Sequence, residues 1–307
     1  MGASYRLRYS SLRTLAALLI APALAVACGA SGEDPTRDPA NPARGDSQET
    51  DAFQETVVED EAEPEDGEGA FVASGESSDG EAGVADRIED VRFQIFDGYE
   101  RLLIDFGGKG RVAGIPKWTV EAPKEGGYVR LRFPDVRSTQ VTHEDFVGSM
   151  LDELYVVRDL DGGLFADVFT MHGFRYRVTG MPESGRLAVD FRGISDEIRF
   201  PPTTGDKAVV LQPREAEEFT SPLDVRGYAR LFEGQVTVTL LDRDRDVLAQ
   251  ETVRANDWAS AWGLFETRIE FSGYEGIATL RVGSRSPKDG SFVGAEAEVF
   301  LESSGPG

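Results

Sequence analysis

The chain has 307 residues, with 32 Lys and Arg against 55 Asp and Glu, and its formal net charge is −23. It contains one Cys and two His, too few for a disulfide scaffold or a Cys/His zinc cage. Such an acidic chain repels phosphate backbones, which argues against nucleic acid as a partner. The length allows about two domains of roughly 100–200 residues each.

The N-terminal 27 residues have the organisation of an export signal. Basic residues occur only before position 14 in this stretch, and residues 15–27 (LAALLIAPALAVA) form an apolar run. The run is shorter than the ~20 residues that a membrane-spanning helix needs, but it suits the central region of a secretory signal. We therefore predict a signal peptide over residues 1–27.

The end of this run resembles a bacterial lipobox, because small residues lead directly to Cys28. The resemblance implies cleavage after Ala27 and lipidation of Cys28, although Ala25 stands where the family usually has Leu. Two or more acyl chains would anchor the protein stably. We expect an extracytoplasmic protein, held by its lipid on the outer face of a cell membrane. The alternative is a plain signal peptide cleaved at the same place, with Cys28 unmodified.

Residues 28–86 are predicted to form a disordered acidic tether. Residues 31–90 contain 20 acidic and three basic residues, so this segment carries −17 of the net charge. Its few apolar residues cannot offset an ordering entropy of ~1–2 kcal/mol per residue, and like-charge repulsion favours an extended chain. The segment could act as a spacer above the membrane, bind calcium or a cationic polymer, or serve solubility alone.

Residues 87–195 are predicted to form a first β-domain. Residues 91–95 (VRFQI) alternate with period two, and Asp97-Gly98 marks a tight turn before a second apolar strand. Residues 159–163 (DLDGG) mark another hairpin. Only residues 143–154 (HEDFVGSMLDEL) look helical, as one or two short turns. Further strands are expected at 101–106, 129–133, 155–157, 164–171, 174–178 and 187–191.

Several of these strands resemble AMIN-like domains. Residues 98–106 (GYERLLIDF) look like the opening hairpin of that family, and residues 176–178 with 186–191 resemble its last hairpin. The resemblance covers residues 88–193 and implies a β-sandwich of the bacterial envelope, where some relatives bind peptidoglycan or localise amidases. A His often found before the opening turn is absent, because Gln94 and Phe96 stand there.

Residues 205–303 are predicted to form a second β-sandwich of about seven short strands. The order Ser-Pro-Leu, Gly-x-Ala, Phe-Glu-Gly and Leu-Asp, followed by Asp-Gly-Ser at 289–291, is distinctive. Over residues 208–302 it resembles the immunoglobulin-like domain of bacterial spore germination proteins (the Gmad family). The resemblance implies a non-catalytic envelope module and does not imply a role in germination. The predicted fold is therefore all-β, with two consecutive sandwiches.

Four arginines form the candidate ligand-binding patch. Arg130, Arg132, Arg175 and Arg177 alternate on two predicted strands, so each pair would face away from the apolar side. Such a patch could hold carboxylate or phosphate groups of an anionic wall polymer. The alternative is that these arginines neutralise acids on the same sheet.

Trp258 is the candidate residue for stacking on a glycan ring. Trp262 and Phe265 follow it closely, and we expect these two in the core rather than on the surface. The alternating acids of residues 242–246 (DRDRD) predict a charged hairpin tip, because the Gly and Glu of a calcium-binding loop are missing.

No catalytic residue, metal ligand or cofactor site is predicted. His143 and His172 stand far apart, and no nucleophile motif accompanies either. The sequence thus predicts a non-enzymatic, lipid-anchored envelope protein that binds peptidoglycan, another anionic wall polymer or an envelope protein. The alternatives are a wall hydrolase whose carboxylates meet only after folding, and a structural subunit of an envelope complex.

Overall fold

A computed structural model describes residues 70–108, 114–123, 127–198, 202–214 and 218–302. Within these ranges the regular structure consists of strands and two 3₁₀ turns (Pro182–Ser184 and Phe232–Gly234), which confirms the all-β prediction. No helix in the described ranges is long and apolar enough to cross a membrane. The predicted signal peptide, Cys28 and residues 28–69 of the predicted tether lie outside the described residues.

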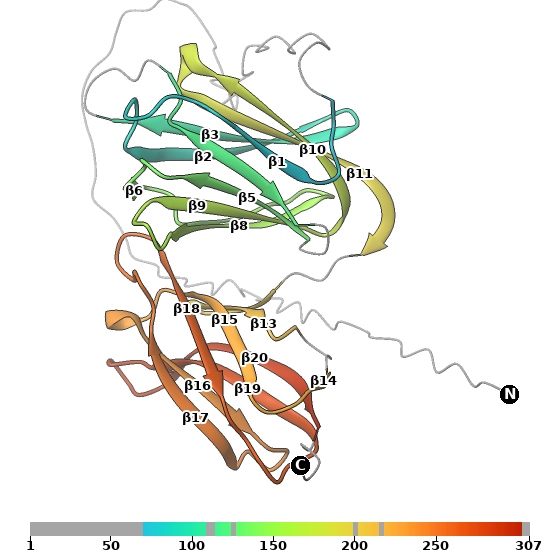
Figure 1. Ribbon diagram of the computed structural model, residues 1–307, viewed down its shortest axis with the longest axis vertical. Coiled ribbons are helices and arrows are strands. Elements are labelled where there is room, and N and C mark those ends of the chain that lie inside the picture. The colour runs from blue at the N-terminus through green and yellow to red at the C-terminus, as the bar shows by residue number, and fades with distance from the viewer. Residues whose placement is uncertain (1–69, 109–113, 124–126, 199–201, 215–217, 303–307) are drawn as a thin grey trace, which may run out of the picture. The chain divides into compact units, whose positions relative to one another are not determined.

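Two sheets form the first sandwich (Figure 1). One follows the order β1 (Gly75–Asp79), β4 (Trp118–Ala122), β5 (Tyr128–Phe133), β9 (Leu164–Thr170) and β8 (Leu151–Arg158), with β7 (His143–Asp145) also on β8. The other follows the order β10 (His172–Met181), β11 (Arg186–Ile198), β3 (Tyr99–Gly107), β2 (Arg87–Phe96) and β6 (Ser138–Thr139).

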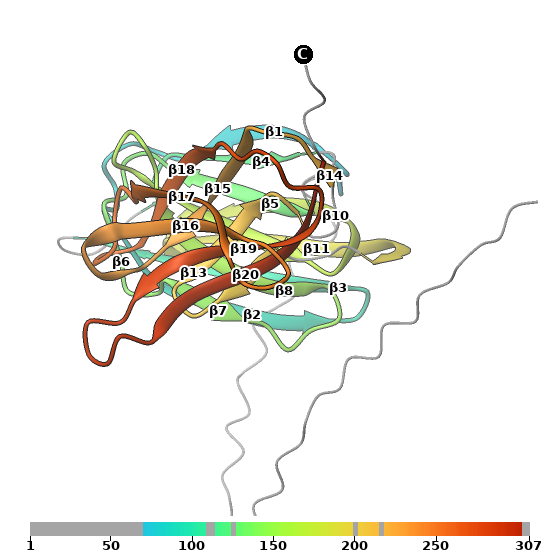
Figure 2. The same ribbon diagram turned by 90° about the horizontal axis from the view of Figure 1, so that it is seen from below.

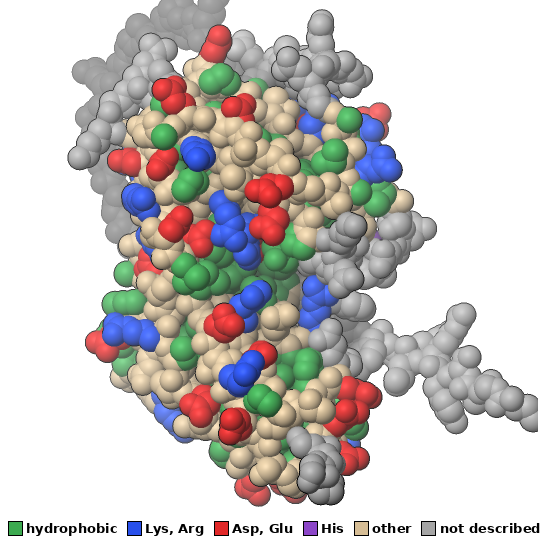
Figure 3. Space-filling model, viewed as in Figure 1, with side chains coloured by type: hydrophobic (Ala, Val, Ile, Leu, Met, Phe, Trp, Pro, Cys, Tyr) green, Lys and Arg blue, Asp and Glu red, His purple; other side chains and the backbone are tan. Residues whose placement is uncertain are grey.

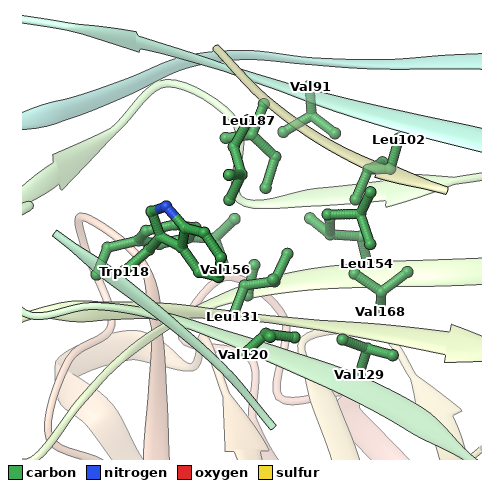
Figure 4. Close-up of a cluster of buried hydrophobic side chains, with 14 of the residues drawn as sticks. Val91, Leu102, Trp118, Val120, Val129, Leu131, Leu154, Val156, Val168 and Leu187 are labelled. Carbon is green, nitrogen blue, oxygen red and sulfur yellow. The ribbon is translucent and has the colours of Figure 1, made fainter. Parts of the chain in front are cut away.

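Alternating apolar residues of both sheets fill the space between them. Figure 4 shows this core, with side chains of both sheets pointing toward one another. Along β5, for example, Val129, Leu131 and Phe133 are fully buried, so the arginines between them face the opposite side of the sheet.

The second sandwich uses the remaining strands. β18 (Trp262–Ile269), β15 (Leu223–Ala229), β13 (Ala208–Gln212) and β12 (Thr203–Gly205) form one layer. β14 (Glu218–Phe219), β20 (Phe292–Leu301), β19 (Gly276–Arg285), β16 (Gln235–Leu241) and β17 (Val247–Arg254) form the other. Figure 2 shows the long neighbouring strands β19 and β20 of this second layer. A separate apolar cluster fills the space between the layers.

One sheet runs through both sandwiches, because β18 pairs in parallel with β8. Trp262 lies opposite Val157 and Gly263 opposite Arg158. A third apolar cluster covers this junction and includes Tyr155, Phe165 and Tyr228. The sequence predicts two consecutive sandwiches but not this shared sheet, because a two-residue parallel contact leaves no periodic signal.

The predicted tether extends too far along the chain. Its last part is described from Ala70 onward, and β1 is the edge strand of its sheet, paired over its full length with β4. All five residues of β1 are exposed, so the strand is held by backbone hydrogen bonds and carries no apolar alternation. Phe71 also packs on Arg177 and Arg192, with 4.8 and 4.4 Å from the guanidinium carbons to the ring centroid.

The predicted helical turns at residues 143–154 are wrong. The structure has β7, a loop and the start of β8 in their place. The ladder between β8 and β9 shifts register between Leu151 and Leu154, and both side chains are fully buried. This irregularity places two inward-facing residues three positions apart, which imitates the spacing of a helix.

The three predicted turns are confirmed. Asp97 and Gly98 join β2 to β3, with a φ of 85° at the glycine, where L residues with a side chain are strained. Residues 159–163 join β8 to β9, and residues 242–246 form the tip between β16 and β17. At that tip the Asp242 carboxylate accepts the backbone N–H groups of Asp244 and Asp246.

The segments that resemble AMIN-like hairpins contain buried charges. Glu100 accepts backbone N–H bonds from Ser149, Met150 and Leu151 at 2.6 to 3.1 Å and so closes one end of the sandwich. On the outer face of the same sheet, the carboxylate of Asp190 on β11 lies between Arg101 and Arg177. Glu100 and Asp190 therefore both act within the first sandwich as structural residues.

Candidate functional site at the sandwich junction

A cavity of about 810 Å³ lies where the two sandwiches meet. Strands of both sandwiches and the loops next to them bring polar and aromatic side chains to this cavity. We call it the junction cavity and define it by six of its lining residues: His143, Tyr155, Lys207, Arg230, Phe232 and Trp258. Its size is within the usual range for sites that bind small molecules.

Two aromatic side chains form the exposed wall of the junction cavity. Phe232 is 57% exposed and Trp258 is 37% exposed, and their rings meet edge to face with 5.5 Å between centroids. Trp262, the first residue of β18, is only 7% exposed and also lines the junction cavity. Trp262 and Phe265 are thus core residues, as predicted, whereas Trp258 presents an accessible apolar face.

Local structure fixes the loop that carries Trp258. The Asp257 carboxylate accepts the backbone N–H groups of Trp258, Ala259 and Ser260 at 2.6 to 3.1 Å. It also lies 3.1 Å from the Nε of Arg158, which belongs to the first sandwich. Burial raises the pKa of Asp257, but these hydrogen bonds outweigh it and the net pKa is lowered.

Two cationic side chains border the junction cavity. Lys207 stands at the turn between β12 and β13, and Arg230 follows β15. The Arg230 guanidinium donates hydrogen bonds to Thr142 Oγ1 at 3.0 Å and to the Ala259 carbonyl at 3.2 Å, and both acceptors are neutral. Its Nε is shielded from solvent and has no hydrogen-bond partner among the described residues. Because both of its acceptors are neutral, the Arg230 guanidinium can donate hydrogen bonds to an anionic group of a ligand.

The opposite wall carries His143, whose ring stacks on Tyr155 at 4.5 Å and meets the edge of Trp262 at 6.3 Å. His143 Nε2 lies 3.4 Å from Asp145 Oδ1 and 3.8 Å from Glu153 Oε2. The Glu153 carboxylate is the main cause of a raised pKa for His143, and burial opposes it only in part. Sequence reasoning missed this group because it assigned the segment to a helix.

The structure does not bring the four predicted arginines into one patch. Arg130 and Arg132 lie on β5, whereas Arg175 and Arg177 lie on β10 of the other sheet. Because each pair faces away from the shared core, the two pairs occupy opposite outer faces. Figure 3 shows acidic and basic side chains interspersed over the face in view.

Three of these arginines are paired with carboxylates. Arg130 makes two hydrogen bonds of 2.7 Å to the fully buried Asp167 and a third, of 3.2 Å, to the Tyr228 hydroxyl. Arg132 pairs with Asp159, and Arg177 with Asp190. Arg175 is exposed and has no ion pair in the described part of the chain. The alternative interpretation of the sequence, neutralisation of acids on the same sheet, thus describes Arg130 and Arg177, and Arg132 too lies 4.0 Å from Glu121 on the neighbouring strand β4.

One comparison with known proteins gives a match. Residues 207–291, less than a third of the chain, match the family model described as the immunoglobulin-like domain of bacterial spore germination (Gmad2). Searches of curated proteins and of solved structures give no match for the chain. The match confirms the immunoglobulin-like resemblance of the second sandwich. The AMIN-like resemblance and the lipobox stay predictions.

Proposed function

We propose that this protein is a non-enzymatic, lipid-anchored component of the bacterial cell envelope that binds an anionic wall polymer, such as peptidoglycan, in the junction cavity. The observation that carries the proposal is the pairing of exposed aromatic faces with a cation that has no carboxylate partner in the described ranges. Trp258 and Phe232 offer flat apolar surfaces for sugar rings, and Arg230 with Lys207 offers charge to carboxylates or phosphates.

The junction cavity supports this function better than the arginine pairs do. A ligand that used Arg130 or Arg177 would have to displace a carboxylate, Asp167 or Asp190, that accepts two hydrogen bonds from that guanidinium and is itself buried. Breaking such a pair costs ~3–5 kcal/mol. At Arg230 the guanidinium only has to exchange neutral acceptors or add a new one, so binding there carries no comparable penalty.

The envelope location rests on the N-terminal sequence. The apolar run and Cys28 support export and lipid attachment, and the acidic segment supports a spacer between the membrane and the sandwiches. Metabolic labelling with a palmitate analogue tests the anchor. We expect label on the wild-type chain and none on the Cys28→Ala chain, and label that persists on the variant contradicts lipidation.

Co-sedimentation with purified cell walls tests the binding site. We expect the wild-type chain to pellet with the walls, and Trp258→Ala and Arg230→Ala to pellet much less. Arg175→Ala is the matched control, because Arg175 is an exposed cation on the far sheet of the first sandwich. Equal pelleting of all four proteins, or a loss with Arg175→Ala alone, contradicts the proposed site. Failure of the wild-type chain to pellet contradicts wall binding altogether.

Two further assays separate the proposal from its alternatives. Clearing of peptidoglycan in a zymogram would contradict the non-enzymatic assignment and favour a hydrolase. Crosslinking to an envelope protein by a chain that does not pellet with walls would favour a protein partner or a structural subunit instead.

A further inference from the structure

Strand geometry places three potential metal ligands on one face of a two-stranded ladder. His143 and Asp145 are two positions apart on β7, so their side chains point to the same side. Glu153 on β8 lies directly opposite Asp145, and Tyr155 lies opposite His143. Residues two apart would diverge on a helix, which is why the sequence pattern alone does not reveal the group.

The donor atoms of these three residues converge. One ligand atom from each residue lies within 4.8 Å of the other two. The separation of 3.4 Å between His143 Nε2 and Asp145 Oδ1 is close to the ~3.4 Å expected between two donors of a tetrahedral Zn²⁺ with bonds of ~2.0–2.2 Å. Glu153 Oε2, at 3.8 Å from the same nitrogen, needs a shift of about half an ångström.

The imidazole nitrogen of His143 that faces the two carboxylates lies within ion-pair distance of both of them. His143 Nε2 is shielded from solvent, and no described group makes a well-formed hydrogen bond with it. Within the described ranges, His143 is also the one basic side chain within 4 Å of the carboxylate of Asp145 or Glu153. A metal ligand must be deprotonated, so metal binding would take place with an unprotonated imidazole, and the two carboxylates then supply negative charge that a divalent cation balances.

Neighbouring groups hold two of these ligands in place. The Tyr155 hydroxyl donates a hydrogen bond to the Glu153 carboxylate, and the Tyr155 ring stacks on the imidazole of His143. Such outer partners orient metal ligands, and their loss lowers metal affinity by about 10–100-fold.

We infer that His143, Asp145 and Glu153 form a binding site for a divalent transition metal, with Zn²⁺ the best match to a donor set of one imidazole and two carboxylates. Three protein ligands leave a coordination position for water or another ligand. Because His143 also lines the junction cavity, the metal would lie at the cavity wall. This inference goes beyond the proposed function and holds whether or not the cavity binds a wall polymer.

Zinc titration of the chelator-treated full chain by calorimetry tests the site. We expect one Zn²⁺ per chain, and at least a tenfold loss of affinity in His143→Ala, Asp145→Asn and Glu153→Gln. Asp145→Asn is the variant least able to disturb folding, since that side chain is 76% exposed. Tyr155→Phe keeps all three ligands, and we expect its affinity to fall by about 10–100-fold.

Two control variants identify the ligands. His172→Ala removes the other imidazole and Cys28→Ser removes the thiol, and both should bind Zn²⁺ like the wild type. Zn²⁺ should also raise the thermal midpoint of the wild type and leave that of Asp145→Asn unchanged. The inference is overturned if the wild type binds no Zn²⁺, if Asp145→Asn and His143→Ala bind it unchanged, or if only Cys28→Ser abolishes binding.

Discussion

Replacement of Arg130 by Ala should destabilise the protein strongly, although sequence patterning places Arg130 among exposed ligand-binding cations. The Arg130 side chain is 16% exposed, and its partner Asp167 is completely buried. The guanidinium makes two hydrogen bonds of 2.7 Å to that carboxylate and packs 4.3 Å from the centroid of Phe165. Arg130→Ala therefore leaves a buried carboxylate whose remaining described side-chain partner is the Tyr228 hydroxyl.

The size of the effect follows from that uncompensated charge. Removing one partner of a buried ion pair costs about 3–5 kcal/mol. Arg175→Ala is the matched control, because this arginine is exposed on β10 and has no ion pair in the described ranges. A surface substitution of this kind changes the free energy of unfolding by less than about 0.5 kcal/mol.

Urea denaturation of both variants and the wild type at neutral pH measures the difference. With a denaturant slope of about 3 kcal/mol/M, Arg130→Ala should lower the unfolding midpoint by about 1–1.7 M. Arg175→Ala should unfold at the wild-type midpoint. If Arg130→Ala remains within about 1 kcal/mol of Arg175→Ala, the reasoning is refuted and Arg130 would again be a candidate ligand-binding residue.

Three other substitutions test separate parts of the account. Glu100→Ala should lower the free energy of unfolding by about 3 kcal/mol or more in calorimetry, since three backbone N–H groups lose their acceptor at about 1–3 kcal/mol each, and a loss below 1 kcal/mol would contradict this. Gly227→Ala should cost about 1–3 kcal/mol, because its Cβ would collide with the Val209 carbonyl, and an unchanged thermal midpoint would be inconsistent with that contact. The pKa of Asp257 is lowered in the folded protein, so its ionised carboxylate stabilises the fold at pH values above the ordinary Asp pKa of about 3.9. This stabilisation is lost as the pH falls below about 3.9 and the carboxylate becomes protonated. Asp257→Asn should therefore flatten the pH dependence of the thermal midpoint between about pH 5 and 3.

Strand alternation and turn chemistry are the parts of this fold that the sequence reveals well. The tight turn at Asp97 and Gly98 and the hairpin tip at residues 242–246 lie where predicted. Both are local features, in which backbone conformation depends on the residues at the turn itself. Trp262 and Phe265 are buried as predicted, because large apolar residues before an alternating strand have few other places to go.

Features that depend on distant partners could not be predicted in the same way. β1 pairs through its backbone and consists only of exposed residues, so nothing in its residues marks it as a strand. The irregular start of β8 imitates helical spacing and conceals the alignment of His143 with Asp145. The partner of Arg130, Asp167, lies within an apolar strand and becomes evident only from the register of β5 against β9.

The junction cavity could not be predicted from the sequence for the same reason. Its walls come from β7, β8, the turn before β13 and the loops around Phe232 and Trp258, which are far apart in the chain. The sequence singled out Trp258 as a candidate stacking residue but could not supply its neighbours. Lys207 and Arg230 become part of a site only because the two sandwiches share a sheet.

The affinity of the chain for purified peptidoglycan fragments, measured by calorimetry for the wild type, Trp258→Phe and Trp258→Ala, tests the central claim most directly. Truncation of an aromatic residue that dominates a binding site costs about 2 kcal/mol or more, which is a factor of roughly 30 in Kd. The account predicts that loss for Trp258→Ala and a much smaller one for Trp258→Phe, with unchanged thermal midpoints. Wild-type affinity in Trp258→Ala would contradict it.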